Sequence, residues 1–467
     1  MPIELSAKEA LPGLATAFDD EAMKGYLQEV LFGADYVVER CTARRPLYVP
    51  GESCLLRYRV AARNRASGEI LEPVVTGRVF PDRSTCTAYM NEKLVPLVER
   101  MQGRPEVAAY AAPAAMIGPL GMVVHIWPVD GELPTLVDAT DRARMIDVLR
   151  EMLPEPFEIE DCEIELVSYR RRQRCVLRYT VAGEEGRLIA YGKVSGVGNH
   201  TPKDAIIGAL RDRIAERGFP ERFTVPRSLG WRRDLQLSLL EAVAGEALIG
   251  PALDARLRGL PPSGVQTLED MVDICGQVAA AVHTSGVTLG PTRTLDDELA
   301  GLQRELAPMR SESQIRLDRI AMLGEQSERL PLRLAHGDFK YEQLLFDGPR
   351  SALVDFDALC QAEPALDLGK FAAHMRVAVR RIEREASQPS ELADELVERF
   401  LRAYLDAPGD QLEDEPQLRT RTALYETVAL LRLTLRDEQN LDEARLELTS
   451  ALLEERLASL VGEAEQR

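Results

Sequence analysis

The sequence predicts an α+β protein in which two small antiparallel sheets come first and a mainly helical region follows. Three observations predict this class. Similar strand-like stretches occur twice before residue 250, the apolar residues recur at helical spacing after it, and one short strand-rich segment at 332–371 interrupts the helices. With 467 residues, the chain is long enough for two or three domains.

The strand-like stretches repeat one another in the same order. Each copy has runs that alternate apolar and polar residues, and later an apolar run that is followed by a turn with Gly-Glu and then by leucine. The matched pairs are 54–60 (CLLRYRV) with 175–181 (CVLRYTV), 74–81 (VVTGRVFP) with 188–196 (LIAYGKVSG), and 123–136 (VVHIWPVDGELPTL) with 237–250 (LSLLEAVAGEALIG). Three matches in one order indicate a duplication.

Each copy is predicted to be a small antiparallel sheet with one helix. These helices are expected near 88–101 and at 202–216, and another helix over 138–153 ends at the acidic, proline-containing Pro154-Glu155-Pro156. We take that stretch as a domain boundary. The predicted domains are 1–153, a degenerate copy of the sheet domain; 154–250, the second copy; and 251–467, the helical domain.

Charge and composition exclude several classes of protein. The net charge of −19 makes the whole molecule repel polyanions, so nucleic acid is not expected as a partner. No uncharged apolar stretch approaches the ~20 residues of a membrane helix, and the first residues lack the pattern of a signal peptide, so we expect a cytoplasmic protein without membrane contact. The seven scattered cysteines favour neither a disulfide framework nor a zinc site. The oligomeric state is left open.

The segment 332–371 contains the residues that phosphoryl transfer requires. It has two strand-like runs joined by the turn DGPR, with His336-Gly337-Asp338 before them, Gln343 five positions after the aspartate, and Asp355 at the end of the second run. In protein kinases, the loop H-R-D-x-x-x-x-N supplies the base and a magnesium ligand, and a later D-F-G supplies the metal-binding aspartate. The order and spacing agree.

These motifs resemble the aminoglycoside phosphotransferase and choline kinase-like superfamily. That group has HGD in the catalytic loop, and after the second acidic motif it has a proline and an aspartate before a helix, as in 363–369 (EPALDLG) here. The resemblance covers roughly 162–467. It implies a protein kinase-like two-lobe fold, here preceded by an extra degenerate copy of the sheet lobe, with ATP and Mg²⁺ as cofactors and a small hydroxyl compound as acceptor.

The resemblance also assigns roles to residues of the segment. Asp338 becomes the general base, His336 helps to hold the catalytic loop, and Asp355 binds magnesium with Gln343. Most relatives have asparagine in place of Gln343, but its amide oxygen is still a hard donor on a longer arm. Maltokinase-like sugar kinases are similar in this glutamine and in an acidic residue such as Asp357, which favours a sugar as the acceptor.

The nucleotide is expected at the second copy, because that copy directly precedes the helical domain. Lys193 resembles the strand lysine that contacts the α- and β-phosphates, whereas the corresponding residue of the first copy is Arg78. Its usual glutamate partner is not evident, and Asp204 is the candidate in its place. The expected cofactor-binding residues are Lys193, the loop residues Arg170, Arg172 and Arg174, and, beside the adenine, Glu241 and Val243.

Two other functions stay open. An aminoglycoside antibiotic is a second possible acceptor, because a cation would suit an acidic helical domain, although acidic helices are commonly only solvated. The chain could instead be a pseudokinase that binds nucleotide and regulates a partner, since Gln343, the glycine-free loop and the missing glutamate depart from the common pattern. Simpler explanations also exist for single residues: Asp338 and Asp355 could be turn residues, and Lys193 could face solvent.

Overall fold

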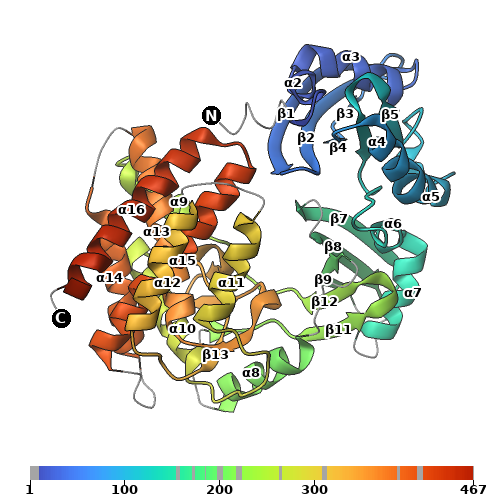
Figure 1. Ribbon diagram of the computed structural model, residues 1–467. Coiled ribbons are helices and arrows are strands. Elements are labelled where there is room, and N and C mark those ends of the chain that lie inside the picture. Colours follow the sequence, from blue (N-terminus) through green and yellow to red (C-terminus); the bar gives the residue numbers. More distant parts are fainter. Residues whose placement is uncertain are drawn as a thin grey trace. The chain divides into compact units, whose positions relative to one another are not determined.

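The chain folds into two compact units (Figure 1). The first unit comprises Met1–His200, Leu229–Leu239 and Glu438–Asp442, and the second comprises Thr201–Ser228, Leu240–Asp437 and Glu443–Arg467. The computed structural model describes residues 10–153, 158–170, 174–184, 186–196, 203–216, 223–261, 266–307, 313–386, 390–407 and 414–465.

The first unit begins with an antiparallel sheet whose strand order is β1-β2-β4-β6-β5, with β3 paired to β2. Alternation along its strands sends one set of side chains, including Leu56 and Tyr58, into a core with helices α2 and α3. The strands are β1 (Tyr36–Val49), β2 (Ser53–Asn64), β3 (Ile70–Leu71), β4 (Val74–Val79), β5 (Ala114–Ile117) and β6 (Met122–Ile126), and the helices are α2 (Leu14–Ala17), α3 (Asp20–Val30), α4 (Arg83–Tyr89) and α5 (Val95–Arg100), the last two joined by a π-helical turn at Met90–Leu94.

A second sheet in the same unit has the order β7-β8-β9-β12-β11, which matches that of the first sheet strand for strand. Its core includes Leu133 to Leu153, so the helices of this segment pack on the second sheet, and the Tyr179 hydroxyl donates to Ala139 O at 2.8 Å. The elements are α6 (Leu136–Ala139), α7 (Arg142–Met152), β7 (Asp161–Arg170), β8 (Arg174–Gly183), β9 (Gly186–Ser195), β11 (Ser228–Arg232) and β12 (Leu237–Glu241).

The second unit is mainly helical, as the sequence predicts after residue 250. Two of its helices begin with capping boxes, in which Thr267 and Thr294 exchange hydrogen bonds with Asp270 and Asp297. The helices are α8 (Asp204–Glu216), α9 (Ile249–Leu257), α10 (Leu268–His283), α11 (Leu295–Leu306), α12 (Ser313–Gln326), α13 (Ala365–Ala386), α14 (Leu392–Leu405), α15 (Glu415–Gln439) and α16 (Glu443–Glu465).

Short strands of the second unit carry the segment that the sequence singles out. They form one sheet with the order β10-β15-β14 and a two-stranded pair, β13 with β16. The strands are β10 (Phe223–Thr224), β13 (Arg333–Ala335), β14 (Leu344–Asp347), β15 (Arg350–Leu353) and β16 (Cys360–Ala362), with short helical turns η5 (Tyr341–Gln343) and η6 (Phe356–Ala358) between them.

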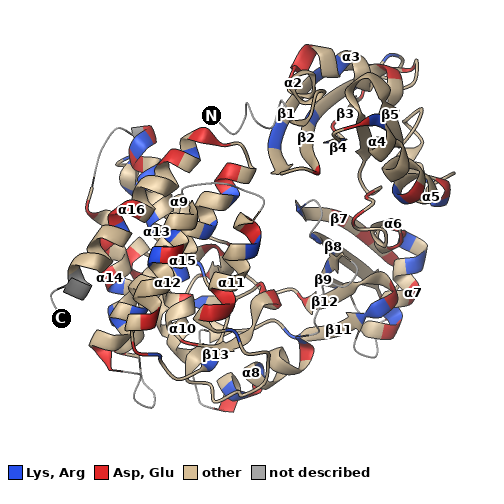
Figure 2. Cartoon of the chain, in the orientation of Figure 1, with Lys and Arg blue, Asp and Glu red and all other residues tan. Residues whose placement is uncertain are grey.

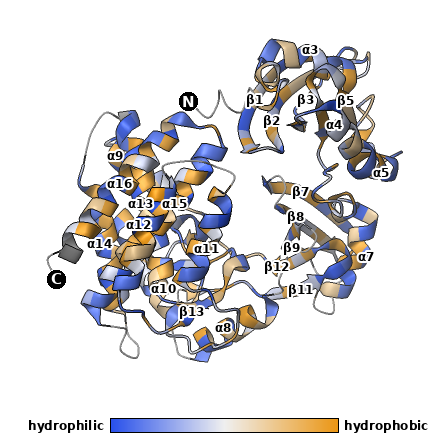
Figure 3. Cartoon of the chain, in the orientation of Figure 1, coloured by the Kyte–Doolittle hydropathy of each residue, from blue (hydrophilic) through white to orange (hydrophobic). Residues whose placement is uncertain are grey.

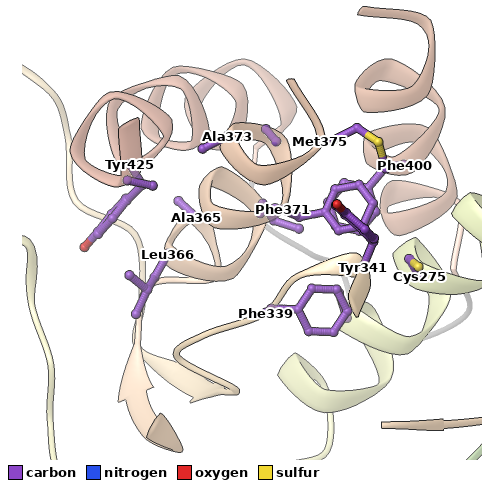
Figure 4. Close-up of a cluster of buried hydrophobic side chains, with 14 of the residues drawn as sticks. Cys275, Phe339, Tyr341, Ala365, Leu366, Phe371, Ala373, Met375, Phe400 and Tyr425 are labelled. Carbon is purple, nitrogen blue, oxygen red and sulfur yellow. The ribbon is translucent and has the colours of Figure 1, made fainter. Parts of the chain in front are cut away.

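One large apolar core holds the helices of the second unit around this segment (Figures 3 and 4). The rings of Phe371 on α13 and Phe400 on α14 stack with centroids 3.8 Å apart, and Phe339 of the segment packs against both. Burying such rings contributes roughly 1.5–3 kcal/mol each. The core therefore fixes the segment directly beside Asp338, which is the neighbour of Phe339 in the chain.

The combination of antiparallel sheets with a helical region is confirmed. Among the described helices, none has the length and apolar character needed to cross a bilayer. All seven cysteines are buried with free thiols.

Candidate active site

The loop after β13 has a backbone that glycine alone accepts without strain. Gly337 has φ of +78°, and a Cβ atom at this position would lie 2.1 Å from Ala358 O, which is a backbone atom. Both facts exclude any larger residue without rearrangement. The Gly337 of the predicted motif thus lets the loop turn sharply, so that Asp338 follows in a partly exposed position with its side chain 34% accessible.

Asp367 on α13 holds this loop from behind. Its carboxylate accepts hydrogen bonds from the backbone N–H groups of His336 at 2.6 Å and Gly337 at 2.8 Å. His283 on α10 lies 3.1 Å from the same carboxylate through Nε2, and its Nδ1 lies 2.9 Å from the Tyr404 hydroxyl on α14. Three helices therefore converge on the loop backbone through fully buried polar groups.

His336 itself is buried and holds the loop to the strand that follows. Its Nε2 lies 3.1 Å from Val354 O, and its ring packs against Phe356 with centroids 5.3 Å apart. The side chain is inaccessible to solvent. These contacts agree with the loop-holding role that the resemblance implies for His336.

Gln343 brings the two predicted carboxylates together. Its Nε2 donates to Asp338 Oδ2 at 3.1 Å and to Asp355 Oδ2 at 3.4 Å. A backbone hydrogen bond also joins the two parts of the segment, because Val354 N donates to Gln343 O at 3.0 Å. Asp355 has φ of +71°, a left-handed conformation that is costly for a non-glycine residue and is found where the surroundings fix it.

Two lysines lie beside Asp338. Lys340 Nζ is 3.2 Å from Oδ2 of Asp338, and Lys370 Nζ on α13 is 4.0 Å from Oδ1 and also donates to Gly337 O. Partial burial raises the pKa of the Asp338 carboxyl, but the ammonium groups of Lys370 and Lys340 lower it more, so that this pKa lies well below its usual range.

The sequence motifs did not indicate these lysines or Arg293, whose guanidinium also reaches Gly337 O at 3.3 Å. Lys370 had a usable signal. It lies three positions after Asp367 on a predicted helix, and residues at this spacing share one face. Arg293 comes from a distant part of the chain and could not be placed without the fold.

The donor atoms of the site show whether it could hold a magnesium ion. The described residues contain no group of three or more His, Cys, Asp and Glu side chains that could hold a metal. Oε1 of Gln343, however, is buried without a hydrogen-bond partner and belongs to the side chain that joins Asp338 and Asp355. Buried polar atoms are normally satisfied, and magnesium prefers oxygen ligands, so this donor set fits the ion.

The predicted nucleotide residues fall in both units. Lys193 lies on β9 opposite Val176, and Arg170 and Arg174 pair across the β7–β8 hairpin in the first unit. Arg172 lies outside the described residues. Because Lys193 and Asp338 belong to different units, the convergence of Lys193 with the carboxylates remains a prediction.

The other predicted residues beside the nucleotide lie in the second unit. Glu241 ends β12, and its carboxylate lies 3.4 Å from the Arg227 guanidinium and 3.9 Å from that of Arg211. Val243 lies in the connection that follows. Asp204, the candidate partner of Lys193, accepts a hydrogen bond from the hydroxyl of Ser228, which belongs to the same unit.

Comparison with known proteins gives a family match for part of the chain. Residues 206–420 match the family model described as the phosphotransferase enzyme family. Among the curated proteins, none matches the sequence significantly.

Similar solved structures include a choline/ethanolamine kinase family protein from Mesorhizobium loti, with 16% identity over 64% of this chain and 92% of that chain and a TM-score of 0.42. A putative aminoglycoside phosphotransferase from Ralstonia eutropha has 14% identity, coverages of 68% and 97%, and a TM-score of 0.43. The choline kinase of Cryptosporidium parvum has 11% identity, coverages of 68% and 96%, and a TM-score of 0.45.

The family match covers the whole segment with the HGD loop, Gln343 and Asp355. It confirms the prediction of an ATP-dependent phosphotransferase with a hydroxyl group as acceptor. Over residues 206–420 the chain is therefore similar to the phosphotransferase enzyme family, in agreement with the resemblance that its motifs carry.

Proposed function

We propose that this protein transfers the γ-phosphoryl group of ATP to a hydroxyl of a sugar, aminosugar or similar metabolite, with Asp338 as the general base. The observation that supports this most is the joint contact of Gln343 with Asp338 and Asp355. Phosphoryl transfer needs a carboxylate for the acceptor hydroxyl and a second one for metal, held a short distance apart. One amide side chain joins two such carboxylates here.

Each residue of the loop has a task in this mechanism. Asp338 accepts the hydrogen bond of the acceptor hydroxyl, orients its oxygen and takes its proton as the bond to phosphorus forms. Partial burial raises the pKa of Asp338, but Lys370 and Lys340 lower it more, so the carboxylate is ionised at physiological pH. Asp355 and Gln343 would hold Mg²⁺, which neutralises charge on the transferred phosphoryl group when bound.

We further propose that the fold is a protein kinase-like pair of lobes preceded by a degenerate sheet lobe. The equal strand order of the two sheets supports a duplication, and Arg78 and Lys193 occupy corresponding positions, opposite Leu55 and Val176. Because the core of the second sheet includes Leu133, we propose a boundary between the copies just before this residue rather than at 154.

Arg78 is unsuited to bind nucleotide phosphates in the first copy. Its side chain is only 8% accessible, and its guanidinium pairs with Glu132 at 2.7 Å and donates to Ser53 Oγ at 3.0 Å. It also lies over the rings of Phe80 and Tyr89, at 5.0 and 4.8 Å from their centroids. A cation that is already satisfied by these groups has little left to offer a phosphate, so we assign the nucleotide to Lys193 in the second copy.

The test is a screen of sugars, aminosugars and aminoglycosides for phosphorylation by ATP in the presence of Mg²⁺. We expect Asp338→Ala to lose at least about a hundredfold in turnover, and Asp355→Ala to lose both rate and response to Mg²⁺. Asp347→Ala is the control, because this exposed carboxylate lies in the turn of the same segment. Equal rates for Asp338→Ala and the unaltered protein would refute the proposed base.

The same screen separates the other functions. Phosphorylation of aminoglycosides in preference to neutral sugars would assign the chain to antibiotic modification. If no acceptor is phosphorylated while ATP still raises the melting temperature, the chain is a nucleotide-binding pseudokinase.

A further inference from the structure

The first sheet carries a group of arginines on its outermost hairpin that the proposed catalysis does not use. Arg44 on β1 lies directly opposite Arg57 on β2, and Arg59 follows Arg57 by two positions and therefore points to the same face. Arg45 follows Arg44 at an irregularity in the pairing of the two strands. We call Arg44, Arg45, Arg57 and Arg59 the arginine patch; the basic band on β1 is visible in Figure 2.

Three arginines of the patch, Arg44, Arg57 and Arg59, differ from other arginines of the hairpin in their ion pairs. Arg40 pairs with Glu72 at 2.9 Å, and Arg63 pairs with Glu39 at 2.6 Å. Arg44, Arg57 and Arg59, by contrast, form no ion pair with any residue that the structure describes. In a chain with 76 acidic and 57 basic residues, several neighbouring arginines without an acidic partner require an explanation.

In the second sheet, the positions that correspond to Arg44 and Arg57 carry opposite charges that neutralise each other. The residues that correspond to Arg44 and Arg57 are Glu165 and Arg178, which face each other across β7 and β8 and form an ion pair of 3.2 Å. The residue that corresponds to Arg59 is Thr180. Where one sheet has an acid–base pair and a neutral side chain, the other has three cations.

This arrangement is unfavourable for the isolated sheet. Like charges directly opposite each other destabilise a pair of strands, whereas opposite charges contribute roughly 0.2–1 kcal/mol. Partial burial, and after it Arg45 and Arg59, lower the pKa of Arg57, whereas Tyr169 acts in the opposite direction. Arg45 has φ of +48°, a strained conformation that often accompanies functional positions.

We propose that the arginine patch binds a small phosphate-bearing anion, such as a nucleotide or a phosphorylated metabolite, outside the catalytic site. Guanidinium groups that extend from adjacent strands match the several oxygens of a phosphate, and each such hydrogen bond is charge-assisted. A small anion suits the patch better than a nucleic acid, because a long polyanion would also meet the acidic remainder of a molecule with net charge −19.

The test measures binding of inorganic pyrophosphate by calorimetry, at low salt and with EDTA present. Arg44→Glu recreates the acid–base pair of the second sheet, and Arg57→Gln removes the central charge without reversing it. We expect each variant to weaken binding by at least about tenfold, and added salt to weaken it further. Circular dichroism checks that the variants fold.

Two controls locate the binding site. Arg83→Glu makes the same charge change as Arg44→Glu on exposed α4 and should bind pyrophosphate as the unaltered protein does. Lys193→Met removes the lysine proposed for the nucleotide phosphates and should retain the pyrophosphate site that Arg44→Glu weakens. Absence of binding, equal binding by Arg44→Glu, or loss of binding in Lys193→Met alone would overturn the proposal.

Further titrations identify the source of the phosphate. ADP and glucose 6-phosphate compare a nucleotide with a sugar phosphate, and glucose serves as the neutral counterpart. Tighter binding of a short single-stranded oligonucleotide than of any of these anions would assign the patch to nucleic acid and also overturn the proposal.

Discussion

At the residue scale, the charge on Asp338 depends on its neighbours more than on its own burial. The groups that face its carboxylate are Lys370, Lys340, His336 and His374, and the two ammonium groups outweigh desolvation, so that its pKa is lowered. His374 is no competitor for protons, because burial first, and Lys340 next, lower its pKa to about 3. An acid limb of the rate is therefore not expected to come from His374.

Lys340→Met tests this electrostatic account. Removal of a cation 3.2 Å from the carboxylate disfavours its ionised form, so the pKa of Asp338 should rise and the acid limb of kcat/KM should move to higher pH by about one unit or more. The measurement is a pH–rate profile of the variant beside Lys93→Met, which removes an exposed lysine of the first unit. An acid limb at the same pH in all three proteins would show that Lys340 does not set this pKa.

The sequence indicated the site residues that form a motif with fixed spacing. It did not indicate the residues that only the fold brings close to that motif. Asp338, Gln343 and Asp355 have fixed spacing in one segment, and the structure brings them together. Lys340 lies in the same segment, but the motif assigns no role to this position. The arginine patch could not be predicted either, because only the strand register shows that Arg44 and Arg57 face each other.

At the scale of elements, the first turns of α13 connect the catalytic loop to the helical core. Asp367 and Lys370 lie one turn apart and reach successive backbone groups of the loop, the N–H groups of His336 and Gly337 and the carbonyl of Gly337. These contacts show that Asp367 braces the catalytic loop.

Asp367→Asn should separate the positioning of the loop from the binding of nucleotide. An amide retains one acceptor oxygen but places an NH₂ group against backbone N–H donors or His283, which leaves buried donors unsatisfied at about 1–3 kcal/mol. We expect kcat to fall by about tenfold or more while KM for ATP changes little. Asp254→Asn, on the surface of α9, is the matched control. A change confined to KM would contradict a role in loop position.

In the repeat, the sequence indicated the strands more completely than the helices. The duplicated strands were visible because their alternation and their cysteines and tyrosines recur. The helix predicted over 138–153 is present, but its counterpart before the first sheet was missed, although Leu11, Leu14, Asp19 and Met23 recur as Leu133, Leu136, Asp141 and Met145. Short amphipathic helices share too few residues to stand out, but in the structure Asp19 and Asp141 both accept a hydrogen bond at a helix start, which makes the correspondence visible.

At the scale of the whole molecule, the two units have separate apolar cores. The large core of helices belongs to the second unit, and the cores of the two sheets belong to the first. Chains built in this way commonly depart from two-state unfolding. We therefore expect calorimetry to resolve two thermal transitions, one for each unit.

Arg421→Ala should shift only one of these transitions. Arg421 on α15 is fully buried, and its guanidinium holds Glu363, with Nε 2.7 Å from Oε2, while Ser327 accepts from the other end at 2.7 Å. Loss of the arginine leaves Glu363 as a buried charge without its partner, which costs about 3–5 kcal/mol. The melting temperature of the second unit should fall by on the order of 10 °C, while the other transition stays in place. Arg419→Ala, on the same helix as Arg421, removes a partly exposed pair with Glu398 of α14 and should cost no more than about 1 kcal/mol. If Arg421→Ala lowered both transitions together, the chain would unfold as one cooperative body and the separation of the cores would have no thermodynamic meaning.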